Sequence, residues 1–271
     1  MTMYFGLSEE QEFFQETISR FLEGESTIEA IRNFAQGNNP DFPESIHSGL
    51  LELGINGLII PEEYGGLEQD LLSAAAVSET LGAGVAISPF IGSYVMAPYA
   101  IIKAGSEAQK DKYLKGIVEG SVRFGVGLTE FVASREGAKI TIESGKANGR
   151  ALFVFDANNA THFLLSDSSG QLFIIDAKTK GLDIIELTTV DKTSSFVELI
   201  IKDVEIDILV NQSNHQDLAQ RVVDLGRLLI AADSLGASQV MINKSVSYSK
   251  ERKQFGRVIG SFQAVKHMCA E

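Results

Sequence analysis

The spacing of apolar residues changes twice along this chain of 271 residues, and these changes restrict the possible folds more than any other feature. Up to about residue 120, apolar residues recur every three or four positions, as on one face of a helix. Between Leu128 and Val210, alternating and β-branched segments are separated by Gly, Asn, Asp and Ser, as in an antiparallel sheet. The helical spacing returns from Leu218 to about Lys250. The sequence therefore predicts an α+β fold.

Three parts follow from this order. We expect an N-terminal helical domain over residues 1–124, a central antiparallel β domain over 125–212 and C-terminal helices over 213–271. Ser8 lies three residues before Gln11, which predicts a capping box at the first helix. Further helices are expected at 41–53, 71–81, 96–104 and 107–118, and strands at 139–142, 151–155, 162–165, 171–175 and 196–201.

Composition excludes several classes of protein. The formal charge is −13 and the pI about 4.8, whereas a nucleic-acid or anionic-membrane surface needs clustered Lys and Arg. Cys269 is the only cysteine and the four histidines are scattered, so we expect neither a disulfide nor a metal site. The N-terminus does not have the pattern of a signal peptide, and no run of 18 apolar residues occurs. We expect a soluble cytoplasmic protein without a membrane or nucleic-acid partner.

A corner near the C-terminus carries the most distinctive side chains. Gly256 interrupts the long helical pattern, which restarts after Ser261, so we expect a tight helix–Gly–helix corner. Arg252, Gln254 and Phe255 lie just before it. Arg suits a phosphate, Phe an aromatic ring face, and a Gln amide a polar ring edge. By itself, this run is more often typical of a solvated helix end with one buried aromatic side chain.

The same run, followed by Phe-Gln-Ala-Val-Lys-His from Phe262, resembles the signature of the acyl-CoA dehydrogenase family of flavoproteins. Leu-Gly-Ile-Asn-Gly-Leu, Pro-Glu-Glu-Tyr-Gly-Gly and Gln-Lys-Asp-Lys-Tyr-Leu also lie where that family has similar segments. The resemblance implies the family's three-part architecture and FAD as cofactor. It implies that Arg252, Phe255 and Gln263 reach an FAD held mainly by a neighbouring subunit, with Gln254 close by.

The resemblance is weaker in the β domain. Where the family has Thr-Glu-Pro-x-x-Gly-Ser-Asp, this chain keeps Thr129, replaces Pro by Phe131 and offers Ser134 as a substitute serine. Where the family has Trp-x-Thr against the flavin, this chain has Phe153 and Phe155. The resemblance thus implies cofactor contacts for Thr129, Ser134 and Phe153. Phe155 has no group that can donate a hydrogen bond to the flavin.

Asp224 and Arg227, three residues apart, lie on one helix face, where a self-contained ion pair is the ordinary interpretation. The family places a similar Asp-x-x-Arg on the wall of its acyl-CoA pocket, so both are candidate substrate residues. Its catalytic base is usually a Glu that would lie beyond Glu271, or in a minority of members stands at the position of Gly226. We therefore assign no catalytic residue. The family builds a four-helix C-terminal bundle, so we expect this chain to end within that domain, with two of its helices present.

Three functions remain open. The chain is expected to be a degenerate subunit that completes the FAD site of a homologous partner in α,β-dehydrogenation of an acyl-CoA. The first alternative is a catalytic homo-oligomer, whose partners would be the acyl-CoA substrate, a second copy and an electron-transfer acceptor. The second alternative is a helical scaffold protein. Thr189–Phe196 and the segment after it resemble the heteromeric branch that acts on sterol-derived acyl-CoAs, which often has Thr-Arg where this chain has Thr193-Ser194.

Overall fold

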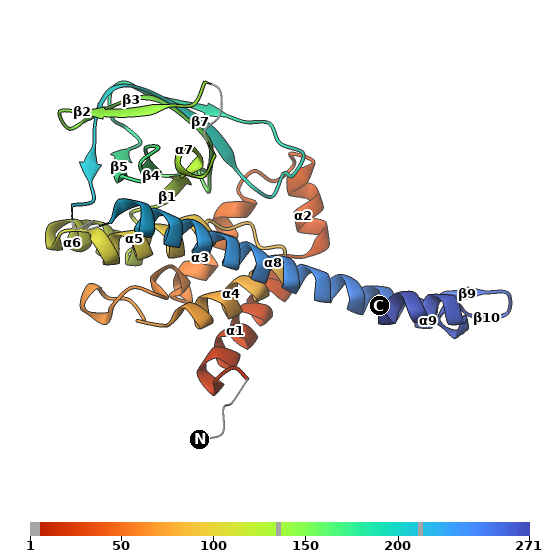
Figure 1. Cartoon of the computed structure of the whole chain (residues 1–271). Helices are drawn as coiled ribbons and strands as arrows, with labels where there is room; N and C mark the ends of the chain where they lie inside the picture. Colours follow the sequence, from red (N-terminus) through yellow and green to blue (C-terminus); the bar gives the residue numbers. More distant parts are fainter. Residues whose placement is uncertain (1–5, 134–136, 211–213) are drawn as a thin grey trace.

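The computed structural model describes residues 6–133, 137–210 and 214–271. A group of helices forms one layer, a strongly curved sheet lies over it, and the long helix α8 crosses the helical layer and continues far beyond it (Figure 1). The central and C-terminal parts follow the helical part in the predicted order.

The helical layer contains more elements than the spacing of apolar residues predicts. The helix missed by the sequence interpretation is α2, and the turn before α5 is π-helical. The capping box at Ser8 is confirmed: the Gln11 N–H donates to the Ser8 hydroxyl, and the Ser8 N–H donates to the Gln11 side chain. The elements are α1 (Glu9–Glu25), α2 (Ile28–Ala35), α3 (Phe42–Glu52), η1 (Ile55–Gly57), η2 (Glu62–Tyr64), α4 (Leu71–Ala83), η3 (Phe90–Met96), α5 (Ala97–Ala104) and α6 (Glu107–Val118).

The sheet has the strand order β6-β7-β3-β1-β4-β5-β8, and β2 pairs with the first residues of β3, whereas β1 pairs with its last residue. Alternate residues of β4 and β5 face in opposite directions, as strand geometry requires. Leu164 and Ile174 join the core shared with the helices, whereas Phe163 and Phe173 join a second core within the sheet. The elements are β1 (Phe124–Gly127), α7 (Thr129–Val132), β2 (Ile140–Glu143), β3 (Lys146–Phe155), β4 (His162–Ser166), β5 (Leu172–Asp176), β6 (Leu182–Glu186), β7 (Phe196–Glu205) and β8 (Asp207–Ile208).

The predicted antiparallel pairing holds for the strand pairs of the described sheet with one exception, which makes the sheet mixed. Strand β1 pairs in parallel with β4, from Phe124 opposite His162 to Gly127 opposite Leu165. Every residue of β1 is buried, so the strand has no polar alternation that would mark it in the sequence. A Cβ on Gly127 would lie 2.7 Å from a methyl group of Val154 and 2.8 Å from one of Leu165, so the glycine admits both side chains.

The long helix α8 (His215–Glu251) differs between its two halves. Its first half packs against α4 so closely that the backbones touch: a Cβ on Gly236 would lie 1.8 Å from the Glu79 carbonyl oxygen, and one on Gly82 would lie 2.1 Å from that of Asp233. Of the described residues beyond Gly236, only Ser249 is fully buried. Residues 238–271, here called the arm, extend away from both layers (Figure 1). By length and apolar composition alone α8 could cross a membrane, a property that core helices of soluble proteins share.

The arm ends in a hairpin and a short helix. Strands β9 (Lys253–Gln254) and β10 (Arg257–Val258) pair across a turn at Phe255 and Gly256, followed by η4 (Ile259–Ser261) and α9 (Gln263–Ala270). Phe255 and Gly256 have φ angles of 53° and 76°, the left-handed conformation that a two-residue hairpin turn requires at both positions. The predicted break at Gly256 and the restart after Ser261 are therefore correct. The segment between the two helices is a hairpin and not a simple corner.

Candidate functional site

The end of the arm presents the predicted cofactor residues to solvent. Arg252 is the C-cap of α8, and its guanidinium makes no hydrogen bond or ion pair within the described parts of the chain. The Phe255 ring is 92% exposed and meets the Phe262 ring edge-on, with 6.1 Å between centroids. Gln254, in β9, and Gln263, the first residue of α9, are also exposed. The fold therefore leaves a cation, an aromatic face and two amides on one exposed tip.

The predicted contacts in the β domain lie in the short helix α7 and in strand β3. The Thr129 hydroxyl donates to the Leu152 carbonyl at 2.6 Å, which places Thr129 beside Phe153. Phe153 is 46% exposed and has a φ of 54°, at a bulge where β3 shifts register against β7. Ser134 lies outside the described residues. Figure 1 shows α7 and β3, the elements that carry Thr129 and Phe153, within the sheet layer and away from the β9–β10 hairpin at the end of the arm.

Asp224 and Arg227 form an ion pair on the exposed face of α8. The Arg227 Nη1 is 2.9 Å from the Asp224 Oδ1, which also accepts from the Gln220 amide. Gly226, between them in sequence, faces the core, and a Cβ there would lie 2.7 Å from the Met96 sulfur. A glutamate in place of Gly226 would therefore have to displace Met96.

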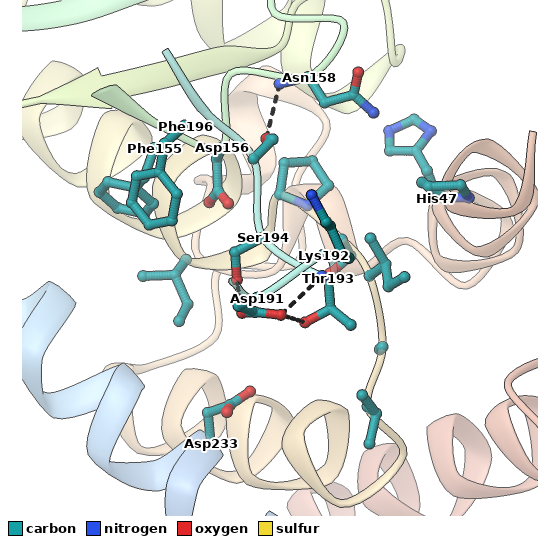
Figure 2. Close-up of a pocket in the computed structure, with 18 of the residues that line it drawn as sticks. His47, Phe155, Asp156, Asn158, Asp191, Lys192, Thr193, Ser194, Phe196 and Asp233 are labelled. Carbon is teal, nitrogen blue, oxygen red and sulfur yellow. Dashed lines mark hydrogen bonds between the residues drawn. The ribbon is translucent and has the colours of Figure 1, made fainter. Parts of the chain in front are cut away.

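A cavity of about 510 Å³ opens between the two layers beside α8 (Figure 2). None of the predicted site residues that the structure describes lines it. Its walls come from α3, the loop between α4 and η3, the end of β3, the loop between β6 and β7, and the residues of α8 that follow Gly226 by about one to three turns. Sequence reasoning missed this site, although one signal was available. Asp233 follows Gly226 and Leu229 at helical spacing and places a carboxyl on the otherwise apolar face of the predicted helix.

Three carboxyl groups face this cavity from different elements. Asp156, at the end of β3, accepts a 2.7 Å hydrogen bond from the Gly92 N–H; burial nevertheless raises its pKa to about 7. Asp233 makes no hydrogen bond or ion pair within the described residues, and its pKa is raised by burial and by the nearby Asp191. Burial also acts to raise the pKa of Asp191, but hydrogen bonds from Ser194 and Thr193 outweigh it and hold that pKa low.

The opposite end of the cavity carries a closed polar cluster. Arg123 donates two hydrogen bonds to Glu44, at 2.8 and 2.6 Å, and this pairing lowers the pKa of Glu44 to about 2. His47 contacts the Tyr94 hydroxyl, and burial lowers its pKa, which favours the neutral imidazole. The Arg123 charge is thus already neutralised within the chain. Lys192 is the remaining cation of the cavity wall, and it has no ion-pair partner within the described residues.

Comparisons with known proteins cover most of the chain. A sequence model described as "Acyl-CoA dehydrogenase, N-terminal domain" matches residues 8–121, and one described as "Acyl-CoA dehydrogenase, C-terminal domain" matches residues 217–271. Acyl-CoA dehydrogenase IpdE2 of Mycolicibacterium smegmatis is 30% identical over 98% of this chain and 72% of its own length. The chain belongs to the acyl-CoA dehydrogenase family. Caffeyl-CoA reductase-Etf complex subunit CarC of Acetobacterium woodii is 28% identical over 99% of this chain and 76% of its own length.

Solved structures of acyl-CoA dehydrogenases share the fold. The structure described as "Tcur3481-Tcur3483 steroid ACAD G363A variant" has a TM-score of 0.83 and 27% identity, covering 97% of this chain and 72% of that one. Members of this family bind FAD. An acyl-CoA dehydrogenase from Bacillus anthracis, described as complexed with FAD, has a TM-score of 0.86 at 24% identity, over 97% of this chain and 48% of that one, and so shows the common fold.

The family's cofactor fits the two candidate regions unequally. FAD carries an anionic diphosphate. The cavity wall presents three carboxyl groups but only one uncompensated cation, Lys192, because Arg123 already pairs with Glu44. Phe155, on the cavity wall, also supplies no hydrogen bond to a flavin. The cavity therefore does not fit FAD. The tip of the arm does fit it, because Arg252 has no partner for its charge among the residues that the structure describes and the Phe255 ring is 92% exposed. Among the described residues, no three His, Cys, Asp or Glu side chains are placed to hold a metal ion.

Proposed function

We propose that this chain is a non-catalytic subunit of an acyl-CoA dehydrogenase and completes the FAD site of a homologous, FAD-binding chain. Arg252 would pair with the cofactor's phosphates, Phe255 would cover an aromatic ring, and Gln254 and Gln263 would supply amide contacts. The complex would carry out α,β-dehydrogenation of an acyl-CoA and pass electrons to an electron-transfer acceptor. A steroid-derived acyl group is the proposed substrate class. The segment Thr189–Phe196 and the likeness to a protein described as a steroid ACAD support it.

The single observation that carries the proposal is the position of the arm's tip. Arg252 lies 16 residues beyond the last glycine at which α8 touches α4, a distance of about 24 Å along a helix. No other described element packs over the tip, and Figure 1 shows it clear of the sheet. An arginine without an ion-pair partner in the described parts of the chain, next to an exposed phenylalanine and away from the cavity, suits a ligand held by another chain.

The chain's own residues give little support to catalysis within it. Removal of an α-proton needs a base within hydrogen-bond reach of that proton. On α8, the position that holds this base in a minority of the family is Gly226, which has Met96 directly against it. Asp224 and Arg227, the proposed substrate residues, are paired with one another on the exposed face.

A second candidate is a catalytic homo-oligomer in which two copies exchange their arms. The observation in its favour is that Thr129 of α7 bonds to the Leu152 carbonyl, next to the partly exposed Phe153 of β3, so a hydroxyl oxygen and an aromatic ring lie close together. In that case, each copy would bind one FAD on its own sheet, and Asp224 and Arg227 would contact the acyl-CoA.

The test is a titration of FAD into the assembled complex, followed by flavin fluorescence. Arg252→Ala removes one charge-assisted hydrogen bond, which lowers affinity for FAD by about 1.5–3 kcal/mol, or roughly ten- to a hundredfold. Lys244→Ala, which removes an equal charge from the exposed middle of the arm, is the matched control and leaves the affinity unchanged. An Arg252→Ala complex with wild-type affinity, in a chain that still assembles, would contradict the proposal.

A further inference from the structure

One exposed face of α8 repeats every seven residues, with large apolar and small side chains in alternation. Its three large members are 49%, 58% and 49% exposed, and its three small members are exposed as well. Steps of three and four residues keep all six on one face, which is not the face on which Gly236 meets α4. The face runs for about 26 Å along the helix. Its members, here called the outer seam, are Leu228, Ala231, Leu235, Ser238, Ile242 and Ser245.

The small residues of the outer seam can be buried without losing a hydrogen bond. The Ser238 hydroxyl donates to the Ser234 carbonyl at 2.7 Å, and the Ser245 hydroxyl donates to the Met241 carbonyl at 2.8 Å. Both donors are thus satisfied within the helix, so a second helix that covers them leaves no unpaired hydroxyl proton. Ala231 has no polar group in its side chain. The outer seam therefore offers three apolar knobs and three shallow hollows, into which the knobs of another helix can fit.

The order of large and small residues along the outer seam is self-complementary. In an antiparallel pair of α8 helices with Leu235 opposite Ser238 of a second copy, Leu228 lies opposite Ser245 and Ile242 lies opposite Ala231. Each layer then combines one large and one small side chain, which fills the space between two helices without a clash. A parallel pair in register would set large against large and small against small. The antiparallel pair is also symmetric, so the same surface serves both copies.

Charge favours the antiparallel pair too. The arm contains six Lys or Arg residues and two Glu residues, so its formal charge is +4. The whole chain carries −13, which leaves −17 on residues 1–237. An antiparallel pair sets each basic arm beside the acidic part of the other copy, whereas a parallel pair sets the two basic arms side by side.

We propose that a second copy of this chain docks on the outer seam, with the two α8 helices antiparallel and Leu235 of each against Ser238 of the other. A contact between two such short seams is small, so we expect a dissociation constant in the micromolar range. At lower concentrations the chain is a monomer, and the contact then adds nothing to the stability of a single copy. Arg252 and Phe255 lie beyond the paired segment, so the proposal does not depend on their role at FAD.

The test exchanges a large and a small residue and follows dimerisation of the full chain by analytical ultracentrifugation. Leu235→Ser sets small against small, and Ser238→Leu sets large against large, twice in each dimer because of the symmetry. Each substitution is expected to weaken dimerisation by about tenfold or more. The double variant Leu235→Ser with Ser238→Leu again sets a large residue against a small one. Its dissociation constant is expected to return to within about threefold of the wild-type value.

Ser247→Leu is the matched control, because it adds the same side chain to a different exposed face of the arm and leaves dimerisation unchanged. A wild-type chain that stays monomeric up to about 100 μM would overturn the proposal. A double variant that dimerises no better than the weaker single variant would also overturn it. That result would mean that a different molecule covers the outer seam, since the exchange restores complementarity only towards a second copy.

This experiment and the FAD titration have independent outcomes. Arg252→Ala is expected to leave dimerisation unchanged, because its side chain lies seven residues beyond Ser245. Loss of dimerisation with a normal response of FAD affinity to Arg252→Ala would remove the outer seam contact alone. The reverse result would remove the proposed role of the tip and leave the contact between copies standing.

Discussion

The two halves of α8 are one continuous helix in opposite surroundings. In the first half, Leu229 and Gly236 are buried, and Ser78 donates a 2.8 Å hydrogen bond to the Leu229 carbonyl. In the arm, Met241 is 57% and Ile242 49% exposed. A sequence pattern that looks equally amphipathic along its length thus serves two purposes. The first half holds this molecule together, and the second presents apolar side chains to something outside it.

The comparison predicts that substitutions in the first half change the stability of the lone chain, whereas substitutions in the arm change its association. Uncovered apolar surface costs roughly 25 cal/mol per Å², so a partner that covers the arm gains this amount on binding. The predictions below test this division.

The largest effect is expected for Gly236→Ala. The new methyl group would lie 1.8 Å from the Glu79 carbonyl oxygen, so α4 and α8 must separate, at a cost of about 3 kcal/mol in the free energy of unfolding. Gly24→Ala is the control, because a Cβ there meets nothing within 4 Å and α1 gains about 0.5–1 kcal/mol. Chemical denaturation measures both. Equal effects of the two substitutions would mean that α8 is not tightly packed on α4.

The next effect concerns pH and the Asp156 carboxyl, which joins the sheet to η3. Burial raises the pKa of this group from 3.8 to about 7 in the folded chain. Between these two pH values the folded state therefore binds more protons than the unfolded state. The stabilisation that this carboxyl contributes is complete below about pH 4 and is lost as the pH rises towards 7. The loss is about 2 kcal/mol, less than the full shift would give, because the side chain keeps some contact with solvent.

Asp156→Asn keeps an acceptor for the Gly92 N–H and removes the titrating group. The difference in unfolding free energy between wild type and variant is therefore expected to change over this interval, with the variant favoured as pH rises. A difference that is flat from pH 4 to 7 would show that Asp156 is ionised in the fold.

A smaller effect is expected in the arm. Ile242→Ser leaves the unfolding free energy of the lone chain within about 0.5 kcal/mol, because about half of the side chain is exposed and it lies outside the buried core. The same substitution weakens association with the partner chain roughly tenfold through lost apolar burial. Ser245→Ala, also on the exposed arm, is the control for a change without apolar loss. Destabilisation of the lone chain by Ile242→Ser would mean that the arm folds back on this molecule.

The fold could be predicted where the sequence pattern is local. The Ser8–Gln11 capping box and the strands with polar alternation follow from neighbouring residues. Strand β1 could not be found this way, because it is buried along its whole length and pairs with residues some 40 positions away. The turn at Phe255 was also missed, because a non-glycine residue with a positive φ leaves little trace in composition.

The same distinction between local and long-range signals applies to the two candidate regions. The tip of the arm was predictable from one short run, since Arg252, Gln254 and Phe255 are neighbours in sequence. The cavity was not, because Asp156, Asp191 and Asp233 are about 40 residues apart and meet only when the sheet lies over α8. Their raised or lowered pKa values are products of that tertiary arrangement.

The most direct measurement of the central claim is the amount of flavin bound per chain, by absorbance, after saturation with FAD and gel filtration. If this chain completes a site held elsewhere, the lone chain retains no flavin, and the assembled complex retains one flavin for each partner chain and none for this one. Arg252→Ala lowers the flavin retained by the complex without changing its composition. One flavin bound to each lone chain would contradict the account, because the cavity or the sheet would then hold FAD without help.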